Sequence, residues 1–234
     1  MEIALTYLNQ NPLLHMGMIV PIKRGTAQIF YEGGEGVLLK EENSSAYMIS
    51  VSTHKDGMRL MEMIPKDAEC DAIVTFHQEF MQNDFKAKIR HTTFLENYQA
   101  VYFSENPLPI LSGITIKALD IRHFELITEN YDVDVGADYL RKRIEKNELF
   151  GGYERDELVG FAGIHAEGSI GLLKVFEQHR GKGYGKTLTA YMVNHQLACG
   201  ITPFMQIGTD NAASLAVARG LNFAISKERV YWMF

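Results

Sequence analysis

The glycine-rich basic stretch between residues 180 and 186 constrains the fold of this chain more than any other feature. It reads Arg-Gly-Lys-Gly-Tyr-Gly-Lys, follows an apolar run that ends at Phe176, and precedes a segment with apolar side chains at helical spacing. This order indicates a strand, a loop and the start of a helix. Glycines leave backbone N–H groups open to an anion, and a helix start adds unpaired donors and a positive dipole end. The stretch therefore predicts a cradle for a phosphate or diphosphate.

The composition is that of an ordinary globular protein with one large domain or two modest ones. Of the 234 residues, 46% are apolar and 22% are charged. The net charge of −6 argues against a nucleic-acid-binding surface, which needs a surplus of Lys and Arg. No apolar run approaches membrane-spanning length, and the first residues lack the pattern of an export signal. We therefore expect a cytoplasmic protein without nucleic-acid or membrane partners.

The two cysteines, Cys70 and Cys199, do not form a Cys-x-x-Cys pair. In a reducing compartment this predicts two buried or half-buried free thiols rather than a disulfide. No metal site is predicted, because nothing in the spacing of the cysteines provides a set of ligands.

The spacing of the glycine loop differs from two common nucleotide-binding patterns. A Walker loop closes a longer run with Gly-Lys-Ser/Thr. The dinucleotide pattern Gly-x-Gly-x-x-Gly lies on a first βα unit, with a ribose-binding acid on the second strand. Neither arrangement is found here.

The spacing Arg180-x-x-Gly183-x-Gly185 closely resembles the pyrophosphate loop of the GNAT superfamily of acyl-CoA-dependent N-acyltransferases. The signature of that loop is Arg/Gln-x-x-Gly-x-Gly/Ala. Upstream, Leu173-Lys174-Val175 matches the apolar strand that precedes the loop in the family. The loop and the strand together are a far more specific signal than the loop alone.

The segment after the loop extends the resemblance. The run from Asn211 to Phe223 resembles a later helix of the family, with Asn-x-x-Ser at its start and a Leu-Gly-Phe-like ending. Residues 202–206 and the terminal Tyr-Trp resemble the FR47-like branch, which is akin to glycine N-acyltransferases. The resemblance covers roughly residues 113–234, and it implies a GNAT fold there.

We expect an α+β protein with a mixed sheet and two domains. A linker at residues 104–109 interrupts both periodicities, so the predicted domains are 1–106 and 107–234. The second domain carries the GNAT resemblance. Its expected elements are a strand at 114–119, helices at 122–131 and 137–147, strands at 150–153 and 158–164, the strand before the loop, the loop helix, a strand at 203–208, the helix after Asn211 and a β tail ending at Phe234.

The first domain repeats this order in outline. Pro12 is a plausible helix start, and residues 52–57 stand where the second domain has its glycine loop, with one glycine and an acid. Two interpretations stay open: a degenerate copy of the GNAT fold without a cofactor site, or an unrelated α+β cap. The expected elements are helical spacing over 1–22, strands at 28–31, 37–39 and 46–51, a helix at 56–64, a strand at 72–76, a helix at 77–89 and a strand at 98–103.

The resemblance implies acetyl-CoA as co-substrate and direct attack of an amine on its thioester. The carbonyl oxygen must be polarised in the transition state, and the backbone N–H of Val175 matches the group that does this in relatives. Leu173 and Val175 share one face of a strand, which also fits a sheet core. The residues expected to bind the cofactor are Leu173, Lys174, Val175, Arg180, Gly181, Lys182, Gly183, Tyr184, Gly185, Lys186, Asn211 and Ser214; for the last two, helix capping is the local alternative.

The amine must lose a proton before it attacks. Relatives often place a Glu for this purpose at the position of Ser169, so the base is not given by the match. Glu167 is our first candidate, acting directly or through a water, and His165 is the second. For both, a solvated or hairpin-stabilising role is the alternative, and a tight turn at Gly168 would break the simple strand parity.

The Tyr that protonates the departing thiolate in many relatives is replaced by Ala218. A thiolate is a tolerable leaving group near neutral pH, so water or Tyr184 can supply the proton. The missing Glu and Tyr also fit a non-catalytic acyl-CoA sensor or scaffold. A third alternative, nucleotide binding through the same loop, predicts that ATP or NAD raises the melting temperature more than coenzyme A does; we expect the reverse.

The acceptor is expected to be a primary amine of a small molecule or an amino acid, by analogy with the FR47-like branch. Pairing of two chains as a homodimer stays open.

Overall fold

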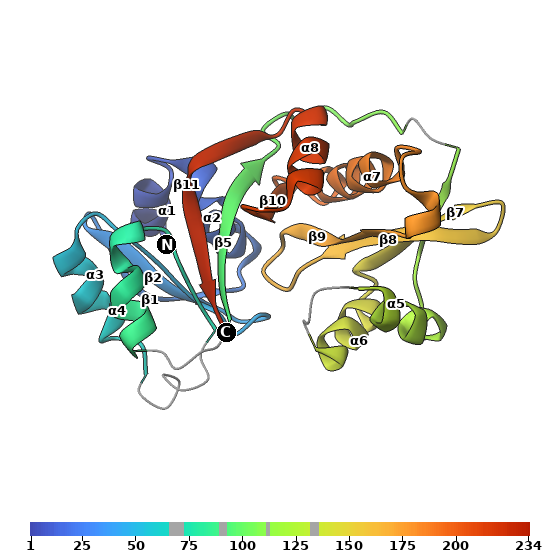
Figure 1. Cartoon of the computed structure of the whole chain (residues 1–234). Helices are drawn as coiled ribbons and strands as arrows, with labels where there is room; N and C mark the ends of the chain where they lie inside the picture. The colour runs from blue at the N-terminus through green and yellow to red at the C-terminus, as the bar shows by residue number, and fades with distance from the viewer. Residues whose placement is uncertain (66–72, 89–92, 111–112, 132–135) are drawn as a thin grey trace. The chain divides into compact units, whose positions relative to one another are not determined.

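The computed structural model describes residues 1–65, 73–88, 93–110, 113–131 and 136–234. The chain divides into two compact units. Unit 1 consists of Met1–Val101, Gln206–Ala212 and Ala224–Phe234, and unit 2 consists of Tyr102–Met205 and Ala213–Phe223. Figure 1 shows both units along the chain. The boundary at 106/107 stays a prediction, and it falls shortly after Val101, where the first segment of unit 1 ends.

Unit 1 is built on a seven-stranded sheet of order β1-β2-β3-β4-β11-β5-β10. Strands β1, β2 and β3 form an antiparallel meander, whereas β3 and β4 pair in parallel. Its helices and strands are α1 (Glu2–Leu8), α2 (Pro12–Arg24), β1 (Ala27–Gly33), β2 (Gly36–Glu41), β3 (Tyr47–Val51), α3 (His54–Met61), β4 (Val74–Phe76), η1 (Glu79–Met81), α4 (Gln82–Lys88), β5 (Phe94–Val101) and β11 (Ala224–Met233), joined by β10 (Phe204–Gly208), whose residues are divided between the units.

Local sequence accounts for the ends of α2. Pro12 occupies the first turn, and the Asn11 side chain accepts the Leu14 N–H at 3.2 Å. Gly25 ends the helix in the left-handed region with φ of 71°. The predicted helix start at Pro12 is confirmed, and the helical spacing over 1–22 corresponds to two helices rather than one.

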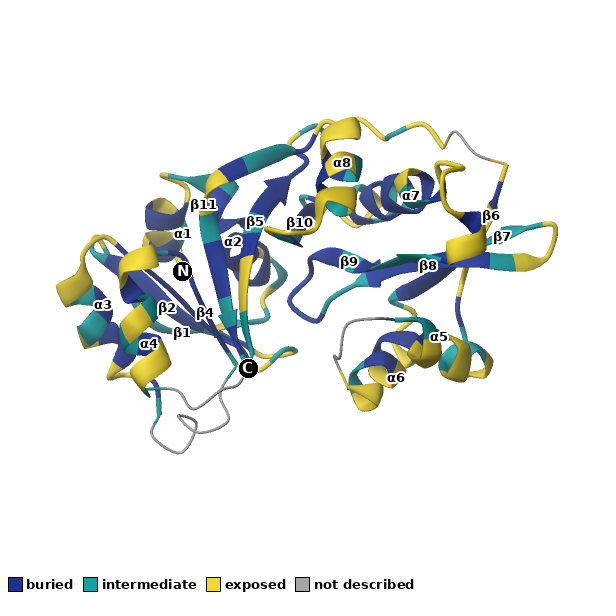
Figure 2. Ribbon diagram, viewed as in Figure 1, coloured by how far each residue is buried: buried dark blue, intermediate teal, exposed yellow. Residues whose placement is uncertain are grey.

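The core of unit 1 contains residues from the first half of the chain and from its last strand, β11. Phe76 of β4 stacks on Phe85 of α4 at 4.6 Å and on Tyr231 of β11 at 5.0 Å between ring centroids. Strands β2 and β3 are almost wholly buried (Figure 2). Because β11 pairs with both β4 and β5, the last strand of the chain completes the sheet of the first unit.

Unit 2 contains a four-stranded antiparallel sheet of order β6-β7-β8-β9. An apolar cluster joins α5 and α6 to this sheet through Ile127, Leu140 and Phe161, and α7 packs on β8 and β9 from the other face (Figure 1). The elements are β6 (Thr115–Ala118), η2 (Ile121–His123), α5 (Phe124–Asn130), α6 (Ala137–Glu145), β7 (Leu149–Glu154), β8 (Glu157–Ile164), β9 (Ile170–Val175), η3 (Glu177–His179), α7 (Tyr184–Ala198) and α8 (Ala212–Gly220).

The predicted mixed α/β fold is confirmed, and the chain repeats one order of elements. Apart from the short 3₁₀ helices, two helices, three strands, a helix, a strand, a helix and a strand occur from α1 to β5 and again from α5 to β11. This repetition supports a degenerate copy of one fold over an unrelated cap. Residue 72 of the predicted strand, residue 89 of the predicted helix and Cys70 lie outside the described residues.

Within the part of the chain that the structure describes, no helix combines the length and the apolar character needed to cross a membrane.

Candidate functional site

The N-terminus of α7 is open. Its N-cap residue is Gly183, in the left-handed region with φ of 82°, and no side chain of the described residues caps the first turn. Gly181 has a similar φ of 80°. An L side chain at either position would be strained, and glycine also leaves the space beside the backbone empty. The first N–H groups of α7 therefore point out of the helix without an intrahelical partner.

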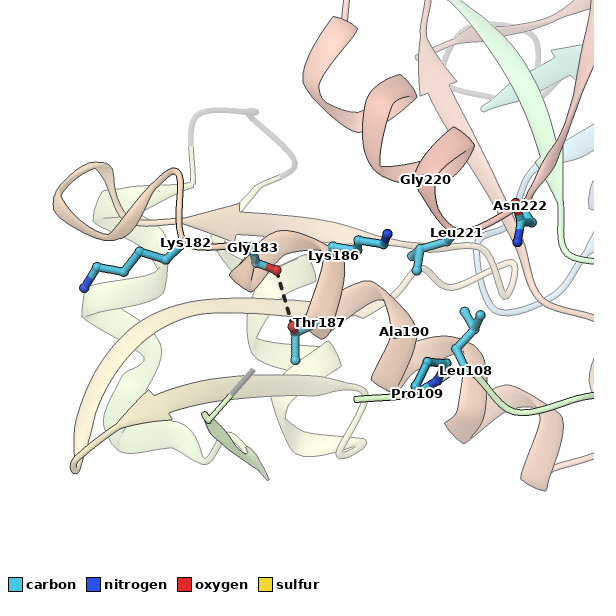
Figure 3. Close-up of a pocket in the computed structure, with 10 residues that line it drawn as sticks. All are labelled: Leu108, Pro109, Lys182, Gly183, Lys186, Thr187, Ala190, Gly220, Leu221 and Asn222. Carbon is cyan, nitrogen blue, oxygen red and sulfur yellow. Dashed lines mark hydrogen bonds between the residues drawn. The ribbon is translucent and has the colours of Figure 1, made fainter. Parts of the chain in front are cut away.

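The three basic side chains of the loop are exposed but are directed differently. Arg180 Nε donates to the Val175 carbonyl at 3.4 Å. Lys182 Nζ lies 3.3 Å from a carboxylate oxygen of Glu154. Lys186 extends toward Gly220 at the end of α8, away from Lys182, as Figure 3 shows. The positive charge is therefore spread along the first turns of α7.

A hollow of about 320 Å³ opens beside these first turns (Figure 3). Its floor is the side of α7 that carries Gly183, Thr187 and Ala190. The hollow is lined by Leu108, Pro109, Lys182, Gly183, Lys186, Thr187, Ala190, Gly220, Leu221 and Asn222.

Glu154, at the end of β7, joins two side chains of the loop. The Tyr184 hydroxyl donates to Glu154 Oε1 at 2.6 Å, and Lys182 contacts Oε2. The Tyr184 hydrogen bond, helped by Lys182, lowers the pKa of Glu154. The same bond raises the pKa of Tyr184. Tyr184 is thus a poorer proton donor than a free tyrosine.

Strand β9 is one of the two edge strands of the four-stranded sheet. Leu172 has a positive φ of 50°, and at this point two residues of β9 face one of β8. This bulge bends the strand and re-aims its backbone groups. An edge strand presents backbone donors and acceptors with which an extended ligand can pair. Leu173, Lys174 and Val175 follow the bulge and are half-buried.

The corresponding strands of the two halves differ in their pairing. In the first half, β3 pairs with β4 through Tyr47↔Val74 and Ile49↔Phe76. In the second half, β9 and β10 belong to different sheets. The β3–β4 pairing therefore uses backbone hydrogen-bonding groups in the first half. The second half has no corresponding β9–β10 pairing among the described residues.

A tight turn joins β8 to β9 and carries both base candidates. His165 N–H donates to the Ser169 carbonyl at 2.8 Å, and Gly168 adopts a φ of 105°. This turn breaks the straight-strand parity. Glu167 is buried, with 6% of its surface exposed, and its carboxylate accepts a hydrogen bond from the Ser169 hydroxyl.

His165 contacts a tyrosine that spacing did not single out. The Tyr139 oxygen lies 2.8 Å from His165 Nδ1 and accepts the Ala166 N–H at 3.1 Å. Since that oxygen already accepts one hydrogen, its own proton is available to Nδ1. Burial lowers the pKa of His165 and raises that of Tyr139. Burial therefore favours the neutral form of His165, and its Nδ1 is engaged by Tyr139.

The turn and the glycine loop lie at opposite ends of β9. With a rise of about 3.3 Å per residue, the strand from Ile170 to Val175 spans roughly 17 Å. An extended pantetheine arm has a comparable length. The structure thus brings Glu167, His165 and Ser169 together at one end and residues 180–186 together at the other.

The remaining predicted site residues lie at the start of α8. Asn211 is exposed and directly precedes this helix, and Ser214 is half-buried in its first turn. The division into units places Asn211 in unit 1 and Ser214 in unit 2. Ala218, which stands where relatives have a tyrosine, is fully buried.

The site also contains residues that sequence reasoning missed. Gln196, near the end of α7, donates from Nε2 to the Gly168 carbonyl at 2.7 Å. Tyr139 and Glu154 are likewise new partners of the base turn and of the glycine loop. These pairs join residues 26 to 30 positions apart, and no spacing pattern links them.

Cys199 is a free, exposed thiol, so the expectation of a buried or half-buried thiol is wrong for this residue. It follows the last residue of α7, on the solvent side of the helix end. Among the described residues, no three side chains of His, Cys, Asp and Glu gather to hold a metal ion.

Comparison with solved structures places this architecture among GNAT folds. A Drosophila protein solved by X-ray crystallography is 14% identical, with a TM-score of 0.71 over 100% of this chain and 95% of that one. A GCN5-related N-acetyltransferase from Kribbella flavida is 11% identical, with a TM-score of 0.58 over 94% and 95%. A GCN5-related N-acetyltransferase-like protein from Streptococcus suis is 15% identical, with a TM-score of 0.55 over 99% of each chain. At these identities the likeness establishes the fold.

The family comparison is more specific. The model described as FR47-like protein matches residues 149–233, which include the turn, β9, the glycine loop and α7. No curated protein matches the chain. Together the family and structural matches confirm the resemblance to the GNAT superfamily and to its FR47-like branch.

Proposed function

We propose that this protein transfers an acetyl or other acyl group from acyl-CoA to a primary amine of a small molecule or amino acid. The observation that carries the proposal is the uncapped, glycine-lined N-terminus of α7 at the end of an edge strand. An open helix start binds a diphosphate, and a free strand edge binds an extended amide-containing arm. Coenzyme A contains both groups in that order.

The loop residues hold the co-substrate. The N–H groups of Tyr184, Gly185 and Lys186 donate to the diphosphate, with Arg180 and Lys182 supplying charge. Lys174 and its neighbours Leu173 and Val175 offer backbone groups to the pantetheine amides. Asn211 and Ser214 are proposed as further contacts, by their match to relatives. Bound acyl-CoA supplies an activated thioester carbonyl.

The chain's own groups then serve two steps. Val175 ends β9 beside the glycine loop, so we propose that its N–H donates to the pantetheine arm, and that a backbone N–H of β9 nearer the turn donates to the carbonyl oxygen as negative charge develops on it. Glu167 takes the proton of the attacking amine, directly or through a water. We prefer Glu167 to His165, because Tyr139 already engages Nδ1 of His165.

The thiolate leaves without an assigned side-chain acid. Ala218 offers no proton, and Tyr184 donates its proton to Glu154. An ordinary thiol has a pKa of about 8.5, so water can protonate the thiolate. The alanine at position 218 and the engagement of Tyr184 by Glu154 also favour the alternative of a non-catalytic acyl-CoA sensor or scaffold.

Free-thiol release from acetyl-CoA with a panel of primary amines separates the two functions. We expect turnover with at least one small amine, and a fall of about 10²- to 10⁴-fold in kcat for Glu167→Gln with unchanged affinity for coenzyme A. Glu177→Gln, which removes an exposed carboxylate beyond the other end of β9, is the matched control and should keep native turnover. Tight binding of coenzyme A without turnover on any amine would instead support the sensor.

A further inference from the structure

We propose that Gln196 is a positioning residue that holds the Glu167 turn at a fixed distance from the glycine loop. The inference rests on the proposed acyl transfer and adds a residue to it. Gln196 lies in α7, is only 1% exposed, and donates from Nε2 to the Gly168 carbonyl at 2.7 Å. Gly168 directly follows Glu167, so this hydrogen bond fixes the backbone beside the proposed base.

The position of Gln196 is unfavourable for packing alone. Its Oε1 is buried and has no hydrogen-bond partner among the described residues. A buried carbonyl without a partner destabilises the folded state. The neighbouring buried positions of α7, Met192 and Val193, are apolar. An apolar side chain would remove the orphaned oxygen but would also remove the donor to the buried Gly168 carbonyl, so the glutamine serves the bond to the turn rather than the packing of this helix face.

Helix α7 connects the two ends of the proposed site. It begins at Tyr184, where the loop ends, and Gln196 lies in its last turn. At 1.5 Å per residue, the helix from Tyr184 to Gln196 is roughly 18 Å long. This length matches the roughly 17 Å of β9 between the loop and the turn. One rigid helix thus sets both ends of the path along which the thioester must lie.

The turn is held from a second side as well. Tyr139 of α6 accepts the Ala166 N–H and contacts His165. The Gln196 bond links the turn directly to the helix that starts at the loop. Loss of this bond should therefore leave the turn folded but release the carboxylate from its place relative to the loop.

The test is a double-mutant cycle of Gln196→Met with Glu167→Gln. In the native background we expect Gln196→Met to lower kcat at least ten-fold, with an unchanged Kd for coenzyme A; the Tm should change little, because the variant removes the orphaned Oε1 but leaves the Gly168 carbonyl without its donor. In the Glu167→Gln background the same change should have little further effect on kcat, because the base it positions is already absent. Gln196→Leu serves as a second variant should the methionine pack poorly.

A structural role gives a different pattern, since the Tm would fall and kcat would drop by the same factor in both backgrounds. That pattern, or a native kcat in Gln196→Met, would overturn the inference while leaving acyl transfer intact. A native protein that binds coenzyme A but turns over no amine would overturn the proposed function, and the inference with it.

Discussion

Glu154 shows at the residue scale how one side chain tunes the proposed site. Its carboxylate holds Lys182 and Tyr184, two residues of the loop that is proposed to receive a diphosphate. A negative charge there opposes a second anion and occupies a lysine that would attract it. Glu154 therefore helps order the loop at the expense of affinity for the ligand.

Glu154→Gln should strengthen the binding of coenzyme A. We expect a roughly two- to five-fold lower Kd at low salt, because Lys182 is released and the Tyr184 hydroxyl can still donate to the amide. The gain should shrink at high salt, since exposed charges are screened. Titration calorimetry at two salt concentrations measures it. Asp156→Asn changes the same charge in the same turn and should have a smaller effect; weaker binding by Glu154→Gln would contradict this account.

At the element scale, two equivalent helix starts have opposite properties. Thr53 caps α3, accepting the Asp56 N–H at 3.2 Å. Gly183 begins α7 with no side-chain cap. In the first half of the chain, a side chain therefore caps the start of α3, and the preceding strand β3 is paired with β4. In the described part of the second half, a helix start without a side-chain cap follows an edge strand.

The elements of unit 2 were largely predictable from sequence because local signals define them. The glycines at 181 and 183 adopt the positive φ that the loop requires, and every expected strand and helix after residue 113 is present. The bulge at Leu172 was not predictable, since leucine carries no signal for positive φ. The partners of Glu167 and His165 were not predictable either, because Gln196 and Tyr139 reach the turn from separate helices.

On the scale of the whole molecule, pairing between distant strands decides the architecture. Strand β11 lies between β4 and β5, so its residues pair with segments more than 100 positions away. Periodicity identifies such a strand but does not identify its partners. Tyr231 of this strand is buried in the core of unit 1.

Unit 1 also contains two buried histidines that must stay neutral. His15 Nδ1 contacts the Leu8 carbonyl, and its Nε2 lies 2.9 Å from the Ser50 hydroxyl. His77 contacts the Ile49 carbonyl through Nδ1, and its buried Nε2 has no partner among the described residues. Burial, together with the nearby His15, lowers the pKa of His77 from 6.5 to about 3. Burial also lowers the pKa of His15, against opposing effects of the Leu8 carbonyl and Glu228.

These shifts predict that acid destabilises unit 1. Above pH 6.5, His77 is neutral in both the folded and the unfolded chain, so its contribution to the free energy of unfolding is fully present. As the pH falls from 6.5 toward about 3, His77 binds a proton in the unfolded chain but stays unprotonated in the folded chain. At pH 5 the protonation of His77 in the unfolded chain alone lowers the free energy of unfolding by about 2 kcal/mol.

Trp232, the single tryptophan, belongs to unit 1 and reports its unfolding. The urea midpoint of Trp232 fluorescence should be lower at pH 5 than at pH 7. His77→Phe should reduce this difference, even though it loses the bond to Ile49 and lowers stability at both pH values. Equal midpoints for the native protein at both pH values would show that neutral histidines do not matter to the fold.

The central claim concerns the open end of α7, and titration calorimetry with coenzyme A tests it most directly. Gly183 and Gly200 both have positive φ, 82° and 70°, with empty space where a Cβ would lie, and they stand at opposite ends of α7. Valine at either position strains the backbone equally, but only at Gly183 does it cover the helix start. We predict that the native protein and Gly200→Val bind coenzyme A and that Gly183→Val binds at least 100-fold more weakly. No binding by the native protein, or equal binding by Gly183→Val, would contradict the account.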